Sequence, residues 1–178
     1  VDHGTCVDTS MGLTPVEGLL MGTRCGDVDA GALSFIMEKE GLDGHGLSDL
    51  INKKSGVAGL VGGSSDMRDL EAADERATLV LDVYNYRIKK YIGAYAAAMG
   101  GCDILVWTGG VGENQWATRR VVCENMEYMG MKIDVEKNEG MRGEEMVIST
   151  PDSKVTIIVV PTDEEYMIAA DTMDILGK

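Results

Sequence analysis

A glycine-rich turn near the middle of the sequence is the first feature that could do chemistry. The apolar run at residues 104–107 predicts a strand buried on both faces, and a helix is predicted from about residue 114 to residue 129. The turn between them consists of Thr108, Gly109, Gly110, Val111, Gly112, Glu113 and Asn114. Backbone N–H groups at such a turn can bind phosphate, and glycine permits close approach. The spacing matches neither standard phosphate-binding pattern, so a purely structural turn is an equally good interpretation.

A single arginine between glycines is the second candidate. Arg24 lies in the segment Met-Gly-Thr-Arg-Cys-Gly at residues 21–26. Its guanidinium could neutralise the charge that spreads over a transferred phosphoryl group. Judged from residue types alone, an ordinary surface pair with Asp27 or Asp29 is the favoured interpretation.

Two segments that contain carboxylates complete the set of candidate sites. The first is Asp66, Met67 and Arg68, where Asp66 could instead cap the following helix and Arg68 could pair with a nearby carboxylate. The second is Asp163, Glu164 and Glu165, because a carboxylate can hold Mg²⁺ beside a transferred phosphate. The alternative for that segment is structural, since Thr162 and Glu165 have the spacing of a capping box.

Strands alternate with helices along the rest of the chain, which predicts one α/β domain with a partly parallel sheet. Apolar periodicity, capping residues and glycine stops predict one helix that begins at Thr14. They predict further helices at residues 29–40, 48–54, 70–99 and 162–176. Residues 59–68 form a predicted Gly/Ser loop. Residues 5–10, 104–107, 131–133, 146–149 and 154–160 have the pattern of strands. The predicted turns between these elements carry the four candidate sites.

Composition excludes several classes of function. The formal net charge of −14 over 178 residues argues against nucleic acid and anionic membranes, which require clustered Lys and Arg. No apolar run is long enough to span a membrane, and no signal peptide is recognisable. Four cysteines without a C-x-x-C pair indicate reduced thiols rather than a disulfide framework or a metal site. We therefore expect a cytoplasmic protein.

Taken in order, the motifs resemble the acetate kinase family along essentially the whole chain. The family pattern is met by the segments at residues 8–26, 52–57 (N-K-K-S-G-V), 66–70 (D-M-R-D-L), 108–114 (T-G-G-V-G-E-N), 142–145, 149–151 and 161–165 (P-T-D-E-E). Two departures are small: Asp163 stands where the family often has Asn, and Trp116 stands where a small polar residue is common. Together these segments are far more specific than a single glycine-rich turn.

The resemblance implies a ribonuclease-H-like domain of the actin-like, sugar-kinase-like ATPase fold. It implies transfer of the γ-phosphoryl group of ATP to acetate, giving acetyl phosphate and ADP reversibly. Arg24 matches the arginine that stabilises the transferred phosphoryl, and Glu164 matches the glutamate associated with Mg²⁺. Nucleotide contacts are implied for Asp66, Met67, Arg68, Gly110, Val111, Gly112, Glu113 and Asn114. The family also implies a homodimer formed through C-terminal domains.

The same resemblance places residues 1–178 in the C-terminal, nucleotide-binding part of such an enzyme. The N-terminal half, with its acetate-binding residues and a catalytic histidine, has no counterpart in this sequence, nor do the opening strands of the domain. We therefore expect a fragment that is inactive by itself. Two alternatives stay open: a propionate or butyrate kinase, and a non-catalytic dimerisation module involving the Tyr-rich helix at residues 84–95.

Overall fold

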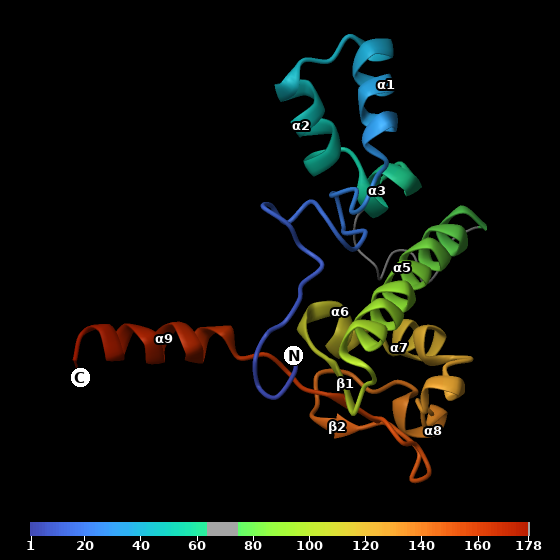
Figure 1. Cartoon of the computed structure of the whole chain (residues 1–178), viewed down its shortest axis with the longest axis vertical. Helices are drawn as coiled ribbons and strands as arrows, with labels where there is room; N and C mark the ends of the chain where they lie inside the picture. Colours follow the sequence, from blue (N-terminus) through green and yellow to red (C-terminus); the bar gives the residue numbers. More distant parts are fainter. Residues whose placement is uncertain (64–74, 178) are drawn as a thin grey trace. The chain divides into compact units, whose positions relative to one another are not determined.

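The computed structural model describes residues 1–63 and 75–177 (Figure 1). It divides into two compact units, Val1–Met99 and Gly100–Lys178. The expectation of a single domain remains a prediction. No helix within the described ranges is both long and apolar enough to cross a membrane.

The first unit is helical. Its elements are α1 (Ala30–Glu40), α2 (Gly44–Lys53), α3 (Gly56–Val61) and α5 (Glu75–Met99). α1 begins and ends as predicted, because the carboxylate of Asp29 accepts a hydrogen bond from the Ala32 amide and Gly41 ends the helix in the left-handed conformation. α2 begins earlier than predicted, since Asp43 caps it by accepting from the Gly46 amide.

Three predictions for the first unit are wrong. α3 occupies part of the segment predicted to be a Gly/Ser loop, and the predicted strand at residues 5–10 is reduced to one bridge between Asp2 and Thr5. No helix follows Thr14, because residues 13–19 form turns and bends. The reason is a long-range contact: the amide of Gly18, which a helix would need, donates instead to the carboxylate of Asp27.

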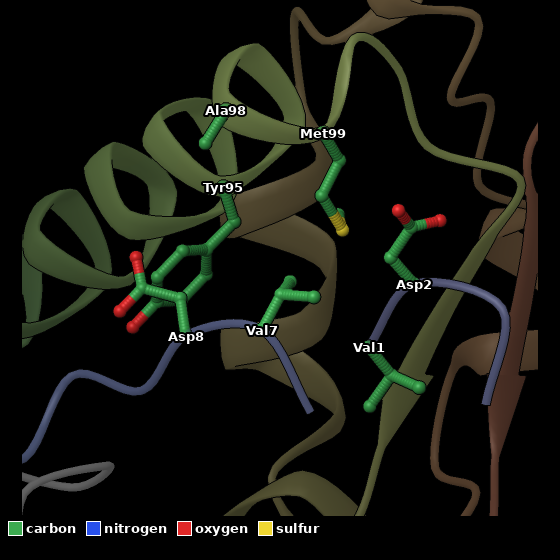
Figure 2. A pocket seen from close by; sticks show the side chains of 7 residues that line it. All are labelled: Val1, Asp2, Val7, Asp8, Tyr95, Ala98 and Met99. Atoms are coloured by element: carbon green, nitrogen blue, oxygen red, sulfur yellow. The ribbon is translucent and has the colours of Figure 1, made fainter. Parts of the chain in front are cut away.

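The core of the first unit lies where α3 packs on α5. Buried Leu20, Val57, Ala77 and Val80 form it, and Val61, Leu81 and Tyr84 pack against it. A separate cavity of about 390 Å³ lies between the N-terminal segment and the last turns of α5 (Figure 2). Its lining includes Val7, Asp8, Tyr95 and Met99, and it contains none of the predicted site residues.

The second unit contains a three-stranded sheet in the order β1-β3-β2. β1 (Ile104–Trp107) is parallel to β3 (Thr156–Val159), and β2 (Met146–Val147) is antiparallel to β3. The chain between β1 and β2 forms α6 (Gly109–Asn114), α7 (Trp116–Cys123), the 3-10 turn η1 (Glu127–Met129) and α8 (Val135–Asn138), and α9 (Glu164–Ile175) follows β3. This is the predicted α/β architecture with a partly parallel sheet.

Only one face of this sheet is buried. Trp107, Ile157 and Val159 share that face and are almost wholly enclosed. On the opposite face Ile104 is 58% exposed and Val106 is 50% exposed, so the prediction of a strand buried on both faces is wrong. The strand predicted at residues 131–133 is also absent as a strand, and a single bridge between Ile133 and Ser149 stands in its place.

Candidate functional site

The glycine-rich turn is itself helical. α6 begins at Gly109, after Thr108 in an extended conformation, so the helix starts earlier than predicted and most of the glycine motif lies inside it. Gly112 is buried against the end of β1, where a Cβ atom would stand 3.1 Å from the carbonyl carbon of Trp107. A side chain at position 112 would therefore push α6 away from the strand.

The side chain of Glu113 stabilises this turn by accepting hydrogen bonds. Its Oε1 accepts hydrogen bonds from the Gly109 amide, the Thr162 amide and the Thr162 hydroxyl, each 2.9 Å long. The two bonds from Thr162 are the main reason that the pKa of the Glu113 carboxyl lies below its ordinary value, with the Gly109 amide adding to them and partial burial opposing them. The carboxylate therefore stays ionised and fixes α6 to the segment that precedes α9.

Asn114 is half-buried at the end of α6. Its Nδ2 donates to the Gly110 carbonyl at 3.0 Å, which closes the last turn of the helix. The predicted nucleotide residues Gly110, Val111, Gly112, Glu113 and Asn114 thus form one short helical turn. The sequence prediction described this segment as a loop, and their role as nucleotide contacts stays a prediction.

Arg119 on α7 is a residue that sequence reasoning missed. Its side chain is fully buried, and its guanidinium donates to the carbonyls of Gly112 (2.7 Å), Glu113 (3.0 Å) and Met141 (2.7 Å) and to Oδ1 of Asn138 (2.8 Å). It therefore holds the C-terminal carbonyls of α6 in place. A signal was present, because Arg119 stands three and four positions before the buried Val122 and Cys123 on one helix face.

Glu164 is exposed at the first position of α9. The helix is capped by Asp163, whose Oδ1 accepts from the Tyr166 amide at 2.9 Å, and not by Thr162 as predicted. Thr162 is unavailable because its amide and hydroxyl both donate to Glu113. Residues 1–63 and 75–177 contain no group of three or more His, Cys, Asp or Glu side chains that could enclose a metal. Mg²⁺ commonly binds one or two carboxylates, water and substrate phosphates, and an exposed Glu164 suits that mode.

Arg24 is not paired in the way that its residue type suggested. Asp27 forms an ion pair with Arg87, with Nη1 and Oδ2 2.7 Å apart, and Asp29 caps α1. No ion pair between described residues involves Arg24, whose guanidinium makes one weak contact with the sulfur of Met21 at 3.9 Å. Within residues 1–63 and 75–177, Asp27 and Asp29 are therefore both engaged with other groups rather than with Arg24.

The turn that carries Arg24 is held by the backbone at residues 55–58. Amides of this segment donate to the carbonyls of Met21, Gly22 and Thr23 over distances of 2.8–3.1 Å. Gly56 has a φ of +65°, and a Cβ there would stand 2.3 Å from the Met21 carbonyl oxygen. The two motif segments at residues 8–26 and 52–57 therefore meet in one structure, with glycine required at their contact.

The remaining predicted residues are distributed as follows. Asp66, Met67 and Arg68 lie outside the described residues. Arg24 belongs to the first unit, whereas Gly110–Asn114 and Glu164 belong to the second. Within the second unit, Glu113 links the glycine turn to the residues beside Glu164.

Comparison with known proteins identifies the family. The model of the acetokinase family matches residues 1–170. Curated relatives include acetate kinases of Parabacteroides distasonis, 85% identical over 182 residues, and Bacteroides thetaiotaomicron, 63% identical over 182 residues. Each of these two alignments covers 100% of this chain and 46% of the relative, so the chain spans about half the length of these relatives.

Solved structures agree with the sequence relatives. The crystal structure of Porphyromonas gingivalis acetate kinase matches with a TM-score of 0.90 and 68% identity, covering 94% of this chain and 43% of that chain. A propionate kinase from Francisella tularensis matches with a TM-score of 0.83 and 35% identity, over 92% of this chain and 42% of that chain. The predicted actin-like, ribonuclease-H-like α/β fold is confirmed. The motifs, the fold and the family model agree, and this chain belongs to the acetokinase family.

Proposed function

We propose that this chain supplies the nucleotide- and phosphoryl-binding part of an ATP:acetate phosphotransferase. Family membership supports the reaction class, and the observation that carries the proposal is the guanidinium of Arg24, which forms no ion pair with another described residue and lies on a turn held by backbone hydrogen bonds. A fixed positive charge with no ion pair among described residues is what phosphoryl transfer requires, because its transition state spreads negative charge over the phosphoryl oxygens.

In the proposed reaction, a carboxylate oxygen of acetate attacks the γ-phosphorus of ATP. The bond from that phosphorus to the β–γ bridging oxygen breaks, and its electron pair leaves with ADP. Arg24 neutralises charge on the transferred group, and the turn from Gly110 to Asn114 binds nucleotide together with Asp66, Met67 and Arg68. Mg²⁺, associated with Glu164, adds neutralisation of phosphate charge when it is bound.

Acetate is the preferred acceptor in this proposal. The propionate kinase structure is 35% identical to this chain, whereas the Porphyromonas gingivalis acetate kinase structure is 68% identical. The proposal also includes a cytoplasmic homodimer. We expect the 178-residue chain to be inactive by itself, because the acetate-binding groups expected of the family are absent from its sequence.

A chimaera tests the proposal. The part of the Parabacteroides distasonis acetate kinase that the alignment leaves uncovered is fused to this chain, and acetyl phosphate is measured by hydroxamate formation. We expect the chimaera to be active and Arg24→Ala to lower its kcat by about 100-fold or more. Arg120→Ala, at an exposed arginine of α7, is the matched control and should leave kcat unchanged.

Two results would contradict the proposal. One is acetate-dependent turnover by the purified 178-residue chain above that of its own Arg24→Ala variant. The other is a chimaera in which Arg24→Ala and Arg120→Ala have the same kcat.

A further inference from the structure

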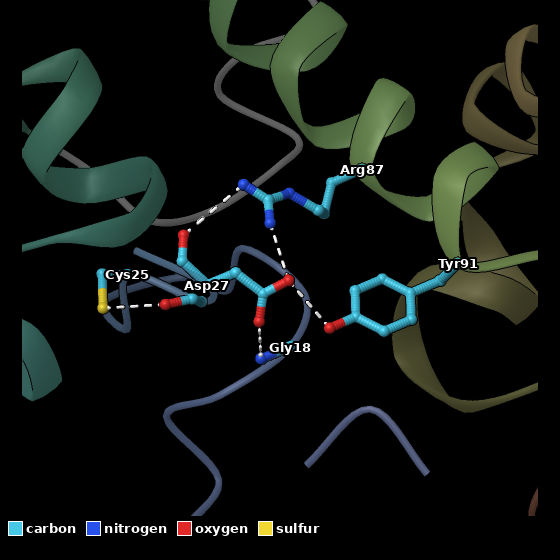
Figure 3. A network of polar contacts seen from close by, with 6 residues as sticks. Gly18, Cys25, Asp27, Arg87 and Tyr91 are labelled. Carbon is cyan, nitrogen blue, oxygen red and sulfur yellow. Dashed lines mark hydrogen bonds and ion pairs between the residues drawn. The ribbon is translucent and has the colours of Figure 1, made fainter. Parts of the chain in front are cut away.

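The carboxylate of Asp27 binds Gly18, at the other end of the loop, and also binds side chains of α5 (Figure 3). Its Oδ1 accepts from the Gly18 amide at 2.8 Å, and its Oδ2 accepts from Nη1 of Arg87 at 2.7 Å and from the Tyr91 hydroxyl at 2.8 Å. Its own amide donates to the Gly18 carbonyl at 3.0 Å. Both carboxylate oxygens are therefore engaged.

These contacts close the loop from Gly18 to Asp27 and fasten it to α5. Arg87 and Tyr91 stand four residues apart on α5, so they project from the same face of that helix. Arg24 lies in the loop, three residues before Asp27. Hydrogen bonds from the backbone of residues 55–58 fix residues 21–23. The backbone hydrogen bond from Asp27 to Gly18 fixes the end of the same loop.

The contacts also decide which cation the carboxylate neutralises. A carboxylate three residues from Arg24 would be its natural partner, and it would then compete with a phosphoryl group for the guanidinium. Arg87 supplies the cation that occupies Asp27 instead. Arg24 is thereby left without an ion pair among the described residues.

We propose that Asp27, bound by Arg87 and Tyr91, is a positioning residue that fixes the Arg24 turn and leaves the Arg24 charge free for substrate. The effect on turnover rests on the function proposed above for Arg24. The fastening of the loop rests only on the contacts within the first unit.

The first measurement uses the 178-residue chain and needs no activity. Hydrogen–deuterium exchange is followed by mass spectrometry in peptides covering residues 18–27. We expect Asp27→Asn and Tyr91→Phe to raise exchange there, because they remove bonds that close the loop. Asp49→Asn is the control, since Asp49 forms an exposed pair with Lys53 on α2. Exchange that stays at the level of the control in both variants would overturn the proposal.

The second measurement separates positioning from mere stability. In the chimaera, we expect Asp27→Asn to lower kcat by about tenfold while the KM for ATP changes by less than about threefold, because Arg24 acts on the transferred phosphoryl. Arg87→Met should be more harmful, since it leaves the Asp27 carboxylate free to neutralise Arg24. Adding Asp27→Asn to Arg87→Met should then restore part of kcat.

The outcomes are distinct. Partial recovery in the double variant supports the proposal, whereas losses that simply multiply overturn it. Faster exchange in Asp27→Asn with a kcat equal to that of Asp49→Asn also overturns it, because the contacts would then serve stability alone. An inactive unmutated chimaera contradicts the proposed function, while the exchange experiment still decides whether Asp27 fastens the loop.

Discussion

The carboxylate of Glu113 holds Thr162 by two hydrogen bonds, one from the Thr162 amide and one from its hydroxyl. The same oxygen atom accepts from the Gly109 amide at the start of α6. One side chain thus fixes the predicted nucleotide turn to the residues that precede Glu164. If nucleotide binds at the turn and Mg²⁺ at Glu164, Glu113 sets the spacing between the two sites rather than acting only as a ligand.

Glu113→Ala should therefore weaken binding of MgADP. We expect the dissociation constant to rise by about tenfold, because three donors lose their common acceptor and the two segments are no longer held together. Thr162→Val keeps the amide donor and loses only the hydroxyl, so its effect should be smaller, about threefold. Binding is measured by tryptophan fluorescence, since Trp107 and Trp116 flank the turn.

Asn114→Ala provides a comparison for this titration. It removes a proposed nucleotide contact whose side chain, among the described residues, donates a hydrogen bond to the Gly110 carbonyl of the same helix. A dissociation constant for Glu113→Ala equal to that of the unmutated chain would show that the hydrogen bonds of Glu113 do not shape the site.

Arg119→Met should destabilise the second unit more than any surface change. It leaves four acceptors without their donor, three of them in buried hydrogen bonds and one in a part-buried one, and such losses cost about 3–5 kcal/mol in the free energy of unfolding. Arg120→Ala is the neighbouring control, because Arg120 is exposed and pairs with Glu124, and it should cost less than about 1 kcal/mol. Urea unfolding of both variants measures the difference, and equal midpoints would contradict this account.

The contrast between Arg119 and the correctly predicted elements shows what sequence reasoning can reach. α1, β1 and α5 were predicted because their caps, apolar runs and periodicity are local. Arg119 was missed because two of its partners, Asn138 and Met141, lie about twenty residues away, although its place on the buried face of α7 was a local signal. The helix predicted at Thr14 failed for the same physical reason, since a carboxylate nine residues beyond Gly18 takes its amide.

The contribution of Asp27 to stability should depend on pH. Burial of this carboxyl raises its pKa, but hydrogen bonds from Tyr91, the Gly18 amide and Arg87 outweigh burial and leave the pKa below its ordinary value. A lowered pKa means that the contribution is present above about pH 4 and is lost as the pH falls through the folded-state value. Asp27→Asn should cost about 1 kcal/mol at pH 7, a modest figure because the side chain is about one-third exposed.

Unfolding by urea at pH 7 and pH 3 measures this dependence. The difference between the unmutated chain and Asp27→Asn should shrink at pH 3, because at about that pH the carboxyl of the unfolded chain is already largely protonated while the folded chain keeps a lowered pKa. A difference that grows on acidification would contradict the direction of the pKa shift. Burial, together with the hydrogen bond to Asp27, raises the pKa of Tyr91 to about 12, so Tyr91 should remain protonated in spectrophotometric titrations up to about pH 11.

Gly56→Ala should be strongly destabilising, because it combines a left-handed φ with a steric clash. A Cβ at this position would stand 2.3 Å from the Met21 carbonyl oxygen and 2.9 Å from the Arg24 amide nitrogen, so the turn that carries Arg24 would have to move. Gly41→Ala isolates the conformational part of the cost, since Gly41 has a φ of +64° with nothing within 4 Å of its Cβ position. We expect about 1 kcal/mol for Gly41→Ala and about 3 kcal/mol or more for Gly56→Ala, measured by urea unfolding. Similar costs for the two variants would mean that the segment at residues 52–57 does not hold the arginine turn, and the rigid placement of Arg24 would lose its main support.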